Sequence, residues 1–370
     1  MHRTTPLAAL LAATLIAATP AIADDRDRDD AESMRPLTMA VIGDWPYNQN
    51  LLDNAALLTR SVNADREVRL VMHVGDIHSG SMPCTSAAIL PPIATADPGW
   101  NQRVYYQFQQ FNAPVVYTPG DNEWADCHKS KEKSAGAPLK ELAAVRSLFF
   151  AKPGRSLGRN EIAVRSQAQH FDSAYPNDAQ FVENVMWEAS RVLFVTLNMP
   201  GSNNDTLPWS GSFNDPAAQA QEVAQRSDAN LRWLEAAFER ATRQHSRAVV
   251  IGLQANMWDP DALVPGGDGL FAYSAFVRKL ADLSLRFAKP VLLFNGDSHI
   301  YGADHPLADP TSAMGRIHAT PAVPNLTRIT VQGSTNAPAE WLRLTIDPRS
   351  ADVFSWSNVA YCKDPLANCK

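Results

Sequence analysis

The sequence predicts an α/β fold in which mixed β-sheets form a sandwich flanked by helices. Two observations carry this prediction. Short apolar runs alternate with amphipathic helical patterns through most of the chain, which is typical of repeated strand–helix units. Near the C-terminus the pattern changes to a period of two, which indicates antiparallel strands. Because no linker or internal repeat divides these patterns, we expect one domain over residues 37–370.

Six continuous apolar runs predict buried strands. They cover residues 37–43, 70–75, 114–119, 192–197, 248–253 and 291–295. A further group of antiparallel strands is expected over 326–356, where Leu342, Leu344 and Ile346 alternate with polar residues.

Amphipathic helices are expected between the strands, because apolar residues recur there on one helical face. Two long segments, 81–99 and 152–184, are interpreted as loops or insertions that could face a substrate. The three apolar helix faces are Leu51, Ala55, Leu58 and Val62; Leu231, Leu234, Phe238 and Ala241; and Phe276, Leu280, Leu283 and Phe287.

The N-terminal residues predict export. Arg3 precedes an apolar run over 7–18, and Ala-Ile-Ala at 21–23 is typical of a cleavage site. A run of about 12 apolar residues is too short to span a bilayer. We therefore expect a signal peptide over 1–23, a periplasmic or secreted protein, and no stable membrane insertion. Residues 24–36 are almost all charged and predict a disordered lead-in.

Four cysteines in an exported chain predict two disulfides rather than a metal cluster. Their spacing favours Cys84 with Cys127 and Cys362 with Cys369, although three connectivities are possible. A reactive thiol is the less favoured alternative.

The composition excludes one class of partner. The chain is 45% hydrophobic and 19% charged, which is ordinary for a soluble globular protein, and its formal net charge is -6. A non-specific nucleic-acid binder needs a basic surface, so no nucleic acid is expected. A small anionic substrate is compatible with this negative net charge, because a bound metal would reverse the local field.

Four aspartates follow a glycine directly after predicted strands: Asp44, Asp76, Asp121 and Asp297. In open α/β sheets, ligands bind beyond the carboxyl ends of the strands. Carboxylates gathered there repel one another unless they are protonated or neutralised by cations. The four aspartates together therefore predict a metal site. A single Gly-Asp pair, such as Gly267-Asp268, is explained by turn chemistry.

The order and spacing of five motifs resemble the calcineurin-like metallophosphoesterases across essentially the whole of 37–370. The strings GDNEW and GDSH are similar to a divergent, exported subgroup. This resemblance implies a four-layer α/β sandwich. The motifs are Asp44-Trp45-Pro46, the stretch from Gly75 to Gly80, Gly120-Asp121-Asn122-Glu123, the strand that ends at Gln254, and Gly296-Asp297-Ser298-His299.

The resemblance implies one or two divalent metal ions. Asp44, Asp76 and His299 would hold one of them. Asp76 would bridge to a second ion held also by Asp121, Gln254 and Asp297. Several of these residues supply oxygen where the family has imidazole nitrogen, and Pro46 cannot ligate at all. Oxygen ligands favour Mg²⁺, Mn²⁺ or Ca²⁺ over Zn²⁺.

The implied activity is hydrolysis of a small phosphoric monoester or diester by a metal-bridging water. Asn122 stands where the family places a histidine that protonates the leaving group. Hydrolysis of diesters, or of esters with an activated leaving group, would therefore be slowed least. His78 either replaces a missing ligand or proton donor, or is a solvated loop histidine. The alternatives are a catalytically degenerate metal- or phosphate-binding protein and a protein whose carboxylates bind structural calcium.

Some neighbouring residues favour structural roles. His73, inside an apolar strand, is interpreted as a hydrogen-bonded core residue. Tyr47 could reach a metal in place of Pro46, but packing is the favoured role. Packing is also favoured for the tryptophans beside the motifs. The polar loop 201–204 either contacts substrate oxygens or is an ordinary turn. These tryptophans are Trp45, Trp124 and Trp258.

Overall fold

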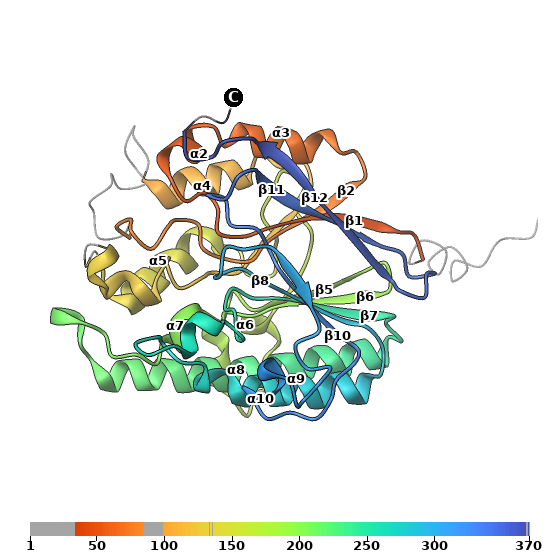
Figure 1. Ribbon diagram of the computed structural model, residues 1–370. Coiled ribbons are helices and arrows are strands. Elements are labelled where there is room, and N and C mark those ends of the chain that lie inside the picture. Colours follow the sequence, from red (N-terminus) through yellow and green to blue (C-terminus); the bar gives the residue numbers. More distant parts are fainter. Residues whose placement is uncertain (1–33, 85–98, 133, 135, 368, 370) are drawn as a thin grey trace, which may run out of the picture.

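The computed structural model describes residues 34–84, 99–132, 134, 136–367 and 369. Over these residues, two mixed β-sheets pack face to face and helices cover their outer sides (Figure 1). The predicted α/β class, with mixed sheets between helices, is confirmed. The expected signal peptide and most of the charged lead-in lie outside the described residues. No helix in the described part of the chain is both long and apolar enough to cross a membrane.

The first sheet has five strands. Its parallel part is formed by β1, β2 and β3, and β11 pairs antiparallel with both β1 and β12. The strand order and bounds are β12 (Phe354–Cys362), β11 (Ala339–Ile346), β1 (Leu37–Ile42), β2 (Val68–His73) and β3 (Val115–Tyr117).

The second sheet has seven strands. Its parallel part is formed by β6, β7, β8 and β10, with β5 antiparallel to β6 and β9 antiparallel to β10. The strand order and bounds are β4 (Arg165–Ser166), β5 (Val185–Ala189), β6 (Val192–Thr196), β7 (Ala248–Gly252), β8 (Val291–Asn295), β10 (Leu326–Thr330) and β9 (Gly302–Asp304).

All six strands predicted from apolar runs are present within a few residues of the expected bounds. The expectation of antiparallel pairing over 326–356 holds for β11 and β12 but is wrong for the central pairing of β10. β10 runs parallel to β8, with Leu326 opposite Val291. The connection through residues 296–325 returns the chain to the same end of the sheet, which produces a parallel pair.

Helices on the outer side of the first sheet form one layer, and helices on the outer side of the second sheet form another (Figure 1). The apolar face expected from Leu51 to Val62 is divided between two helices that meet near Asn54. The expected loop over 152–184 contains β4 and a short helix. The first layer contains α2 (Gln49–Asp53), α3 (Ala56–Ala64), α4 (Trp100–Phe108) and α5 (Pro138–Phe149); the second contains α8 (Pro216–Arg243), α9 (Ser274–Phe287) and α10 (Ala313–Arg316); the short helix is α6 (Gln167–His170).

The main apolar core lies between the two sheets. Met39 and Met72 of the first sheet pack in one cluster with Val250 and Phe294 of the second, and all four are fully buried. Burying a side chain of this size stabilises the fold by about 1.5–3 kcal/mol. Because this core fixes how the sheets face each other, it also fixes where their strand ends meet.

Both predicted disulfides are present. Cys84 is bonded to Cys127 with a Cα–Cα distance of 5.8 Å, and Cys362 to Cys369 with 4.8 Å. Cys127 lies in the 3₁₀ turn η2 (Ala125–His128), which follows Asp121. The first disulfide therefore fixes the segment that carries one of the four predicted site aspartates.

Candidate active site

The four aspartates lie together at the carboxyl edge of the parallel strands. Asp44 follows β1, Asp76 follows β2, Asp121 follows β3 and Asp297 follows β8. The backbone N–H of Asp297 donates to Asp44 Oδ1 over 3.1 Å, which joins a strand end of one sheet to a strand end of the other. The motifs thus meet across the open end of the sandwich.

Three of the four aspartates adopt left-handed backbone conformations. Their φ angles are +50° at Asp44, +59° at Asp76 and +72° at Asp297. Aspartate is among the few residues other than glycine that visit this region routinely. The neighbouring glycines serve another purpose: a Cβ on Gly120 would lie 2.0 Å from Asp76 Oδ1, and one on Gly296 would lie 2.5 Å from Asp44 Oδ2. Each of these glycines makes room for the carboxylate of a different motif.

Asp44, Asp76 and His299 form a compact set of possible metal ligands. One ligand atom from each lies within 4.8 Å of the others. His299 Nε2 is 3.3 Å from Asp44 Oδ1, and this carboxylate raises the imidazole pKa against the lowering effect of burial. Asp44 Oδ2 is buried without a hydrogen-bond partner among the described residues. A buried carboxylate oxygen without a partner is unfavourable unless a cation or water satisfies it.

Tyr47 connects the members of this set. Its hydroxyl lies 2.6 Å from Asp76 Oδ2, 3.0 Å from Asp44 Oδ1 and 3.1 Å from His299 Nε2. Burial and the two carboxylates raise the pKa of the phenol well above its usual value, so it keeps its proton. The interpretation of Tyr47 as a packing residue was therefore incomplete: the side chain is buried, but its hydroxyl belongs to the polar site.

Asn122 supports the same centre. Its side-chain nitrogen donates to Asp76 Oδ2 over 3.0 Å, and it also lies 3.1 Å from the Tyr47 hydroxyl and 3.1 Å from the His78 carbonyl oxygen. An amide N–H stays bonded to its nitrogen at ordinary pH. Asn122 can therefore orient Asp76, but it cannot protonate a leaving group.

Gln254 lies between Asp76 and Asp121 with a fixed orientation. Its oxygen accepts a hydrogen bond from the backbone N–H of Gly201, which can only donate. The side-chain nitrogen must then face the acids, and it lies 3.1 Å from Asp121 Oδ1 and 3.3 Å from Asp76 Oδ2. In this arrangement Gln254 presents hydrogens, not a lone pair, to the place between the two carboxylates.

Burial and mutual repulsion raise the pKa values of three acids of the site. The pKa of Asp76 is raised well above its usual value by burial and by Asp121, and that of Asp297 is raised by burial and by Asp121. The pKa of Asp121 is raised by burial and by Asp126. A cation bound among them would remove this repulsion and lower their pKa values.

His78 is buried, so the interpretation as a solvated loop histidine is wrong. Its Nδ1 lies 3.2 Å from the carbonyl oxygen of Ser79, and its Nε2 has no hydrogen-bond partner in the described part of the chain. Burial lowers the pKa of this imidazole to about 4. Its ring groups with Glu132 and the disulfide-bonded Cys84 rather than with the three-residue set around Asp44.

A cavity of about 270 Å³ adjoins Asp121 and Asp297. Lys129, Lys131 and Ser202 bring positive charge and a hydroxyl to its wall. Ser202 Oγ lies 3.1 Å from Asp121 Oδ2, and Lys129 Nζ donates to that hydroxyl over 2.7 Å. The two lysines were not found from the sequence, because nothing in their spacing relates them to the Gly-Asp motifs.

The loop expected over 201–204 is a left-handed turn. It is α7 (Gly201–Asp205), in which four successive residues from Ser202 to Asp205 have φ between +50° and +59°. Both asparagines are buried, but Asn203 lines the cavity, whereas Asn204 is bonded to Arg226 and does not. A Cβ on Gly201 would lie 2.7 Å from Asp121 Oδ2 and 2.8 Å from Asp297 Oδ1.

His73 and the three tryptophans beside the motifs are buried, in agreement with their interpretation as structural residues. His73 is buried, and its Nε2 lies 2.9 Å from the carbonyl oxygen of Trp45. Asp268 follows no strand and lies 3.9 Å from Lys129 at the rim of the cavity. The three tryptophans beside the motifs, Trp45, Trp124 and Trp258, are at most 1% exposed.

Comparison with known proteins assigns no family. No protein-family model matches the chain, and no curated protein matches it. Among solved structures the chain is similar to GAP50, the anchor in the inner membrane complex of Plasmodium, with a TM-score of 0.40 and 10% sequence identity. The alignment covers 89% of this chain and 90% of that chain. A similarity this low carries no argument about function, so the function is inferred from the site itself.

Proposed function

We propose that this chain is an exported, metal-dependent hydrolase of phosphoric esters with a metallophosphoesterase-like fold. The observation that carries the proposal is the convergence of Asp44, Asp76 and His299, whose ligand atoms all lie within 4.8 Å of one another. The two disulfides support export, because disulfides persist in oxidising compartments.

The donor set fits one hard divalent cation. Two carboxylates and one imidazole suit Mg²⁺ or Mn²⁺ better than a thiolate-seeking metal. The partnerless Asp44 Oδ2 supplies the lone pair that such an ion would take up. A cation bound there would provide Lewis-acid polarisation of a phosphoryl oxygen and activation of a water nucleophile.

The residues proposed for a second metal fit less well. Gln254 points its N–H groups at Asp76 and Asp121, and an amide nitrogen in that orientation does not ligate a cation. A second ion therefore has no role in the proposed mechanism.

The chain's own residues supply binding and orientation. Lys129 and Lys131, which form ion pairs with Asp126, lie in the wall of the cavity beside Asp121 and would contact a phosphoryl group bound there. Asn122 and the Tyr47 hydroxyl hold Asp76 in place. Because the His78 imidazole is neutral at neutral pH, it is no ready proton donor, and the site favours esters whose leaving group needs no protonation.

A second candidate is a binding protein that has lost turnover. The Gln254 amide favours it, because it satisfies by hydrogen bonding two carboxylates that the family resemblance assigns to a metal. In this alternative the cavity would bind a phosphorylated molecule or a cation without chemical change.

One set of assays separates these candidates. Protein purified from an oxidising compartment is treated with chelator, reconstituted with Mg²⁺, Mn²⁺, Ca²⁺ or Zn²⁺, and assayed on aryl phosphate monoesters and diesters, with metal binding measured by calorimetry. We expect metal-stimulated hydrolysis that Asp76→Asn reduces by about 100-fold or more, whereas the exposed Asp282→Asn leaves it unchanged. Metal binding without turnover would support the binding protein, and neither binding nor turnover would refute both.

A further inference from the structure

Acidic side chains predominate in the lining of the cavity beside the candidate metal site. Lys129 and Lys131 lie in its wall, and both form ion pairs with the buried Asp126. The other charged residues of the lining are acids: Asp121, Asp259, Asp261, Asp268 and Asp297. Because both lysines already have a carboxylate partner, the five acids give the lining a net negative charge.

Three of these acids come from one loop, residues 259–269. They are Asp259, Asp261 and Asp268. Of the five acids in the lining, only Asp268 forms an ion pair in the described part of the chain, with Lys129 at 3.9 Å. Asp259 and Asp261 thus line the cavity without a cationic partner among the described residues.

The spacing of the loop carboxylates favours an organic cation over a metal ion. The described residues contain two sets of three His, Cys, Asp or Glu side chains whose ligand atoms lie within 4.8 Å of one another, and neither set includes an acid of this loop. A divalent ion needs oxygen atoms that converge to about 2.0–2.6 Å from one point. An alkylammonium group is larger, and it is attracted by carboxylates that lie further apart.

Asn203 adds a hydrogen-bond donor to the same cavity. Its side chain is 2% exposed, and its oxygen accepts from the Ala272 N–H over 3.0 Å. Its nitrogen is buried without a partner among the described residues. A Cβ on Gly269, which also lines the cavity, would lie 3.7 Å from this nitrogen. Because a buried N–H without an acceptor is unfavourable, a ligand here should bring an oxygen atom as well as a cation.

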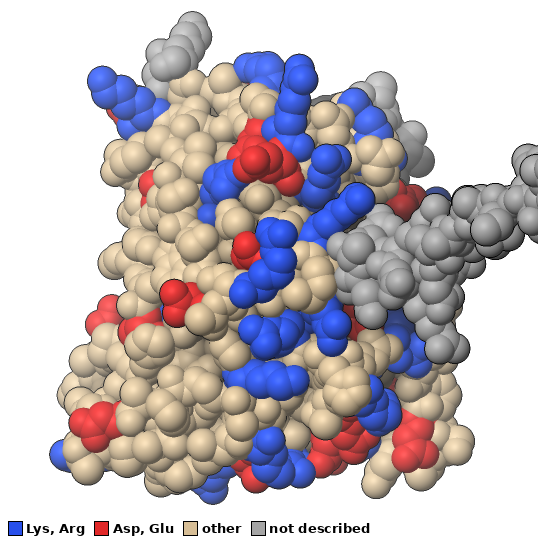
Figure 2. Space-filling view, turned by 90° about the vertical axis from the view of Figure 1, so that its right-hand side faces the viewer, with Lys and Arg blue, Asp and Glu red and all other residues tan. Residues whose placement is uncertain are grey.

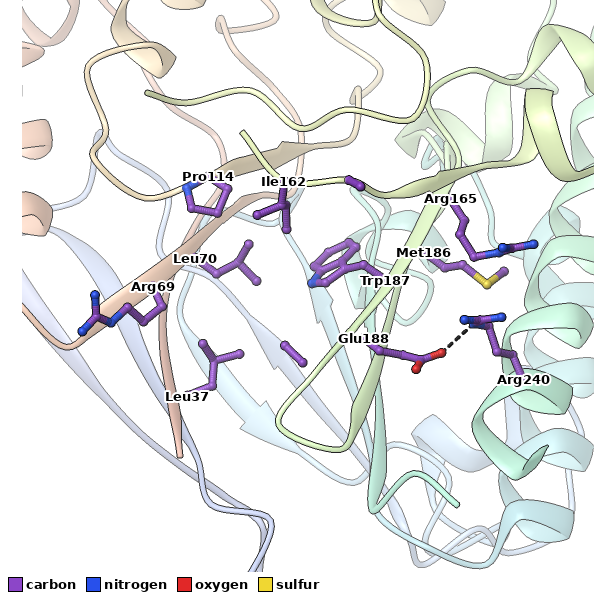
Figure 3. Close-up of a pocket in the computed structure, with 12 residues that line it drawn as sticks. Leu37, Arg69, Leu70, Pro114, Ile162, Arg165, Met186, Trp187, Glu188 and Arg240 are labelled. Carbon is purple, nitrogen blue, oxygen red and sulfur yellow. Dashed lines mark ion pairs between the residues drawn. The ribbon is translucent and has the colours of Figure 1, made fainter. Parts of the chain in front are cut away.

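The opposite end of the sheets has basic surroundings. A cavity of about 440 Å³ there is lined by apolar side chains such as Leu37, Leu70 and Trp187, with Arg69 and Arg165 on opposite sides (Figure 3). Lys and Arg side chains form a band over this side of the molecule (Figure 2). Positive and negative charge are thus separated along the strands, and the resulting field attracts a cationic group toward the acidic cavity.

We propose that the acidic cavity binds a phosphorylated amino alcohol, with its ammonium group near Asp259 and Asp261. The phosphoryl group lies toward the candidate metal site, and Asn203 donates to one of the ligand's oxygens. This assignment rests on the proposed function, because the metal site fixes the position of the phosphoryl group. An ester with a neutral substituent would leave both carboxylates unpaired, and one with a second anionic group would be repelled by them.

The size of the cavity limits the length of the amino alcohol. Its volume of about 270 Å³ is close to the lower limit of about 300 Å³ for small-molecule pockets. A chain of a few carbon atoms between the phosphoryl and ammonium groups therefore suits the site better than a long one.

The test is calorimetric titration of the full mature chain, with Mg²⁺ or Mn²⁺ added, using two phosphonates that cannot be hydrolysed at the carbon–phosphorus bond. One carries a trimethylammonio group at the end of a propyl chain. Its isostere carries a tert-butyl group at that position, so the two differ in charge and not in shape. We expect the cationic phosphonate to bind at least about tenfold more tightly than the tert-butyl isostere.

Charge-removing variants locate the ammonium group. Asp259→Asn and Asp261→Asn each remove one negative charge and keep the shape of the side chain. Each should weaken binding of the cationic phosphonate by about threefold, as for a partly exposed ion pair, without weakening that of the tert-butyl isostere. Asp172→Asn is the matched control: Asp172, like Asp259, accepts a backbone N–H two residues further along the chain, but it does not line the cavity.

The outcomes separate this proposal from the proposed function. Equal binding of the two phosphonates, together with hydrolysis of aryl esters, would overturn the preference for a cation and leave the hydrolase intact. Preference for the cationic phosphonate without any hydrolysis would support the ligand class and refute turnover. Ca²⁺ binding that is lost in Asp261→Asn but kept in Asp172→Asn would assign the loop acids to a metal ion and overturn the proposal.

Discussion

The Gln254 side-chain nitrogen donates to Asp121 Oδ1 over 3.1 Å, so an amide joins a strand end of the second sheet to an acid from the first. The same amide accepts a hydrogen bond from Gly201 and lies near Asp76. A single neutral side chain thus holds together groups from several strand ends, and the stability of the metal-free site depends on it.

Replacing Gln254 with methionine is expected to destabilise the metal-free protein. Methionine keeps the approximate length of the side chain, but it removes one donor from each of two buried carboxylates and leaves the Gly201 N–H without an acceptor. The free energy of unfolding should fall by about 1–3 kcal/mol, measured by urea denaturation after chelation. Gln221→Met, at an exposed position of α8, is the control. An equal effect at both positions would show that the amide is not a structural link.

Gly201→Ala is expected to separate the acids of the site. The added Cβ would press on Asp121 and Asp297, and overpacking of this kind destabilises by about 1–3 kcal/mol. The free energy of unfolding should therefore fall by this amount, measured by urea denaturation. Gly302→Ala is a matched control, because a Cβ there meets nothing within 4 Å. Unchanged stability of Gly201→Ala would contradict the close approach of Gly201 to the two carboxylates.

Glu132 is expected to make stability fall as pH rises. Burial and the nearby Asp126 raise its pKa to about 10, so the folded state holds a proton that the unfolded state has lost above its ordinary pKa of 4.5. Between these values the group should reduce the free energy of unfolding by up to about 1.4 kcal/mol per pH unit.

The test compares wild type with Glu132→Gln by urea denaturation from pH 5 to pH 9. Because glutamine does not titrate, the variant should gain stability relative to wild type as the pH increases. Glu239→Gln, at an exposed position in α8, should follow the wild-type profile. Parallel profiles for wild type and Glu132→Gln would mean that Glu132 does not hold its proton in the folded protein.

The two disulfides are expected to differ in their contribution to stability. Cys84 and Cys127 are 43 residues apart, and Cys362 and Cys369 are 7 apart. On a chain-entropy estimate they stabilise by about 4 and about 2 kcal/mol, because the longer loop restricts the unfolded chain more. Cys84→Ala/Cys127→Ala should therefore lower the melting temperature more than Cys362→Ala/Cys369→Ala. The reverse order would point to strain or to residual structure in the unfolded chain.

The apolar runs in the sequence predicted the buried parallel strands, but they did not predict which strands pair with one another. The six central strands are continuous apolar runs because both of their faces are covered. β5 alternates less clearly, and β9 is short and mostly exposed, so neither produces a strong pattern. The direction of β10 depends on the path of residues 296–325, which no local pattern encodes.

The site was predictable to the extent that it depends on backbone position. Glycine followed by aspartate at strand ends indicated which acids would meet, since parallel strands end at one edge of a sheet. The orientation of the Gln254 amide depends on the backbone of Gly201, and the role of the Tyr47 hydroxyl depends on three strand ends. Such contacts arise only from tertiary packing.

The left-handed turn of α7 narrows the set of sequences that can build this site. Residues other than glycine, asparagine and aspartate lose about 1–2 kcal/mol in that conformation. Four successive residues of the turn adopt it, and only Ser202 among them is outside these three types. Most random substitutions between Ser202 and Asp205 would therefore be selected against even where the side chain touches no ligand. A change of specificity by gradual mutation would have to occur on the opposite wall of the cavity, around Lys129 and Lys131, where the backbone sets no such limit.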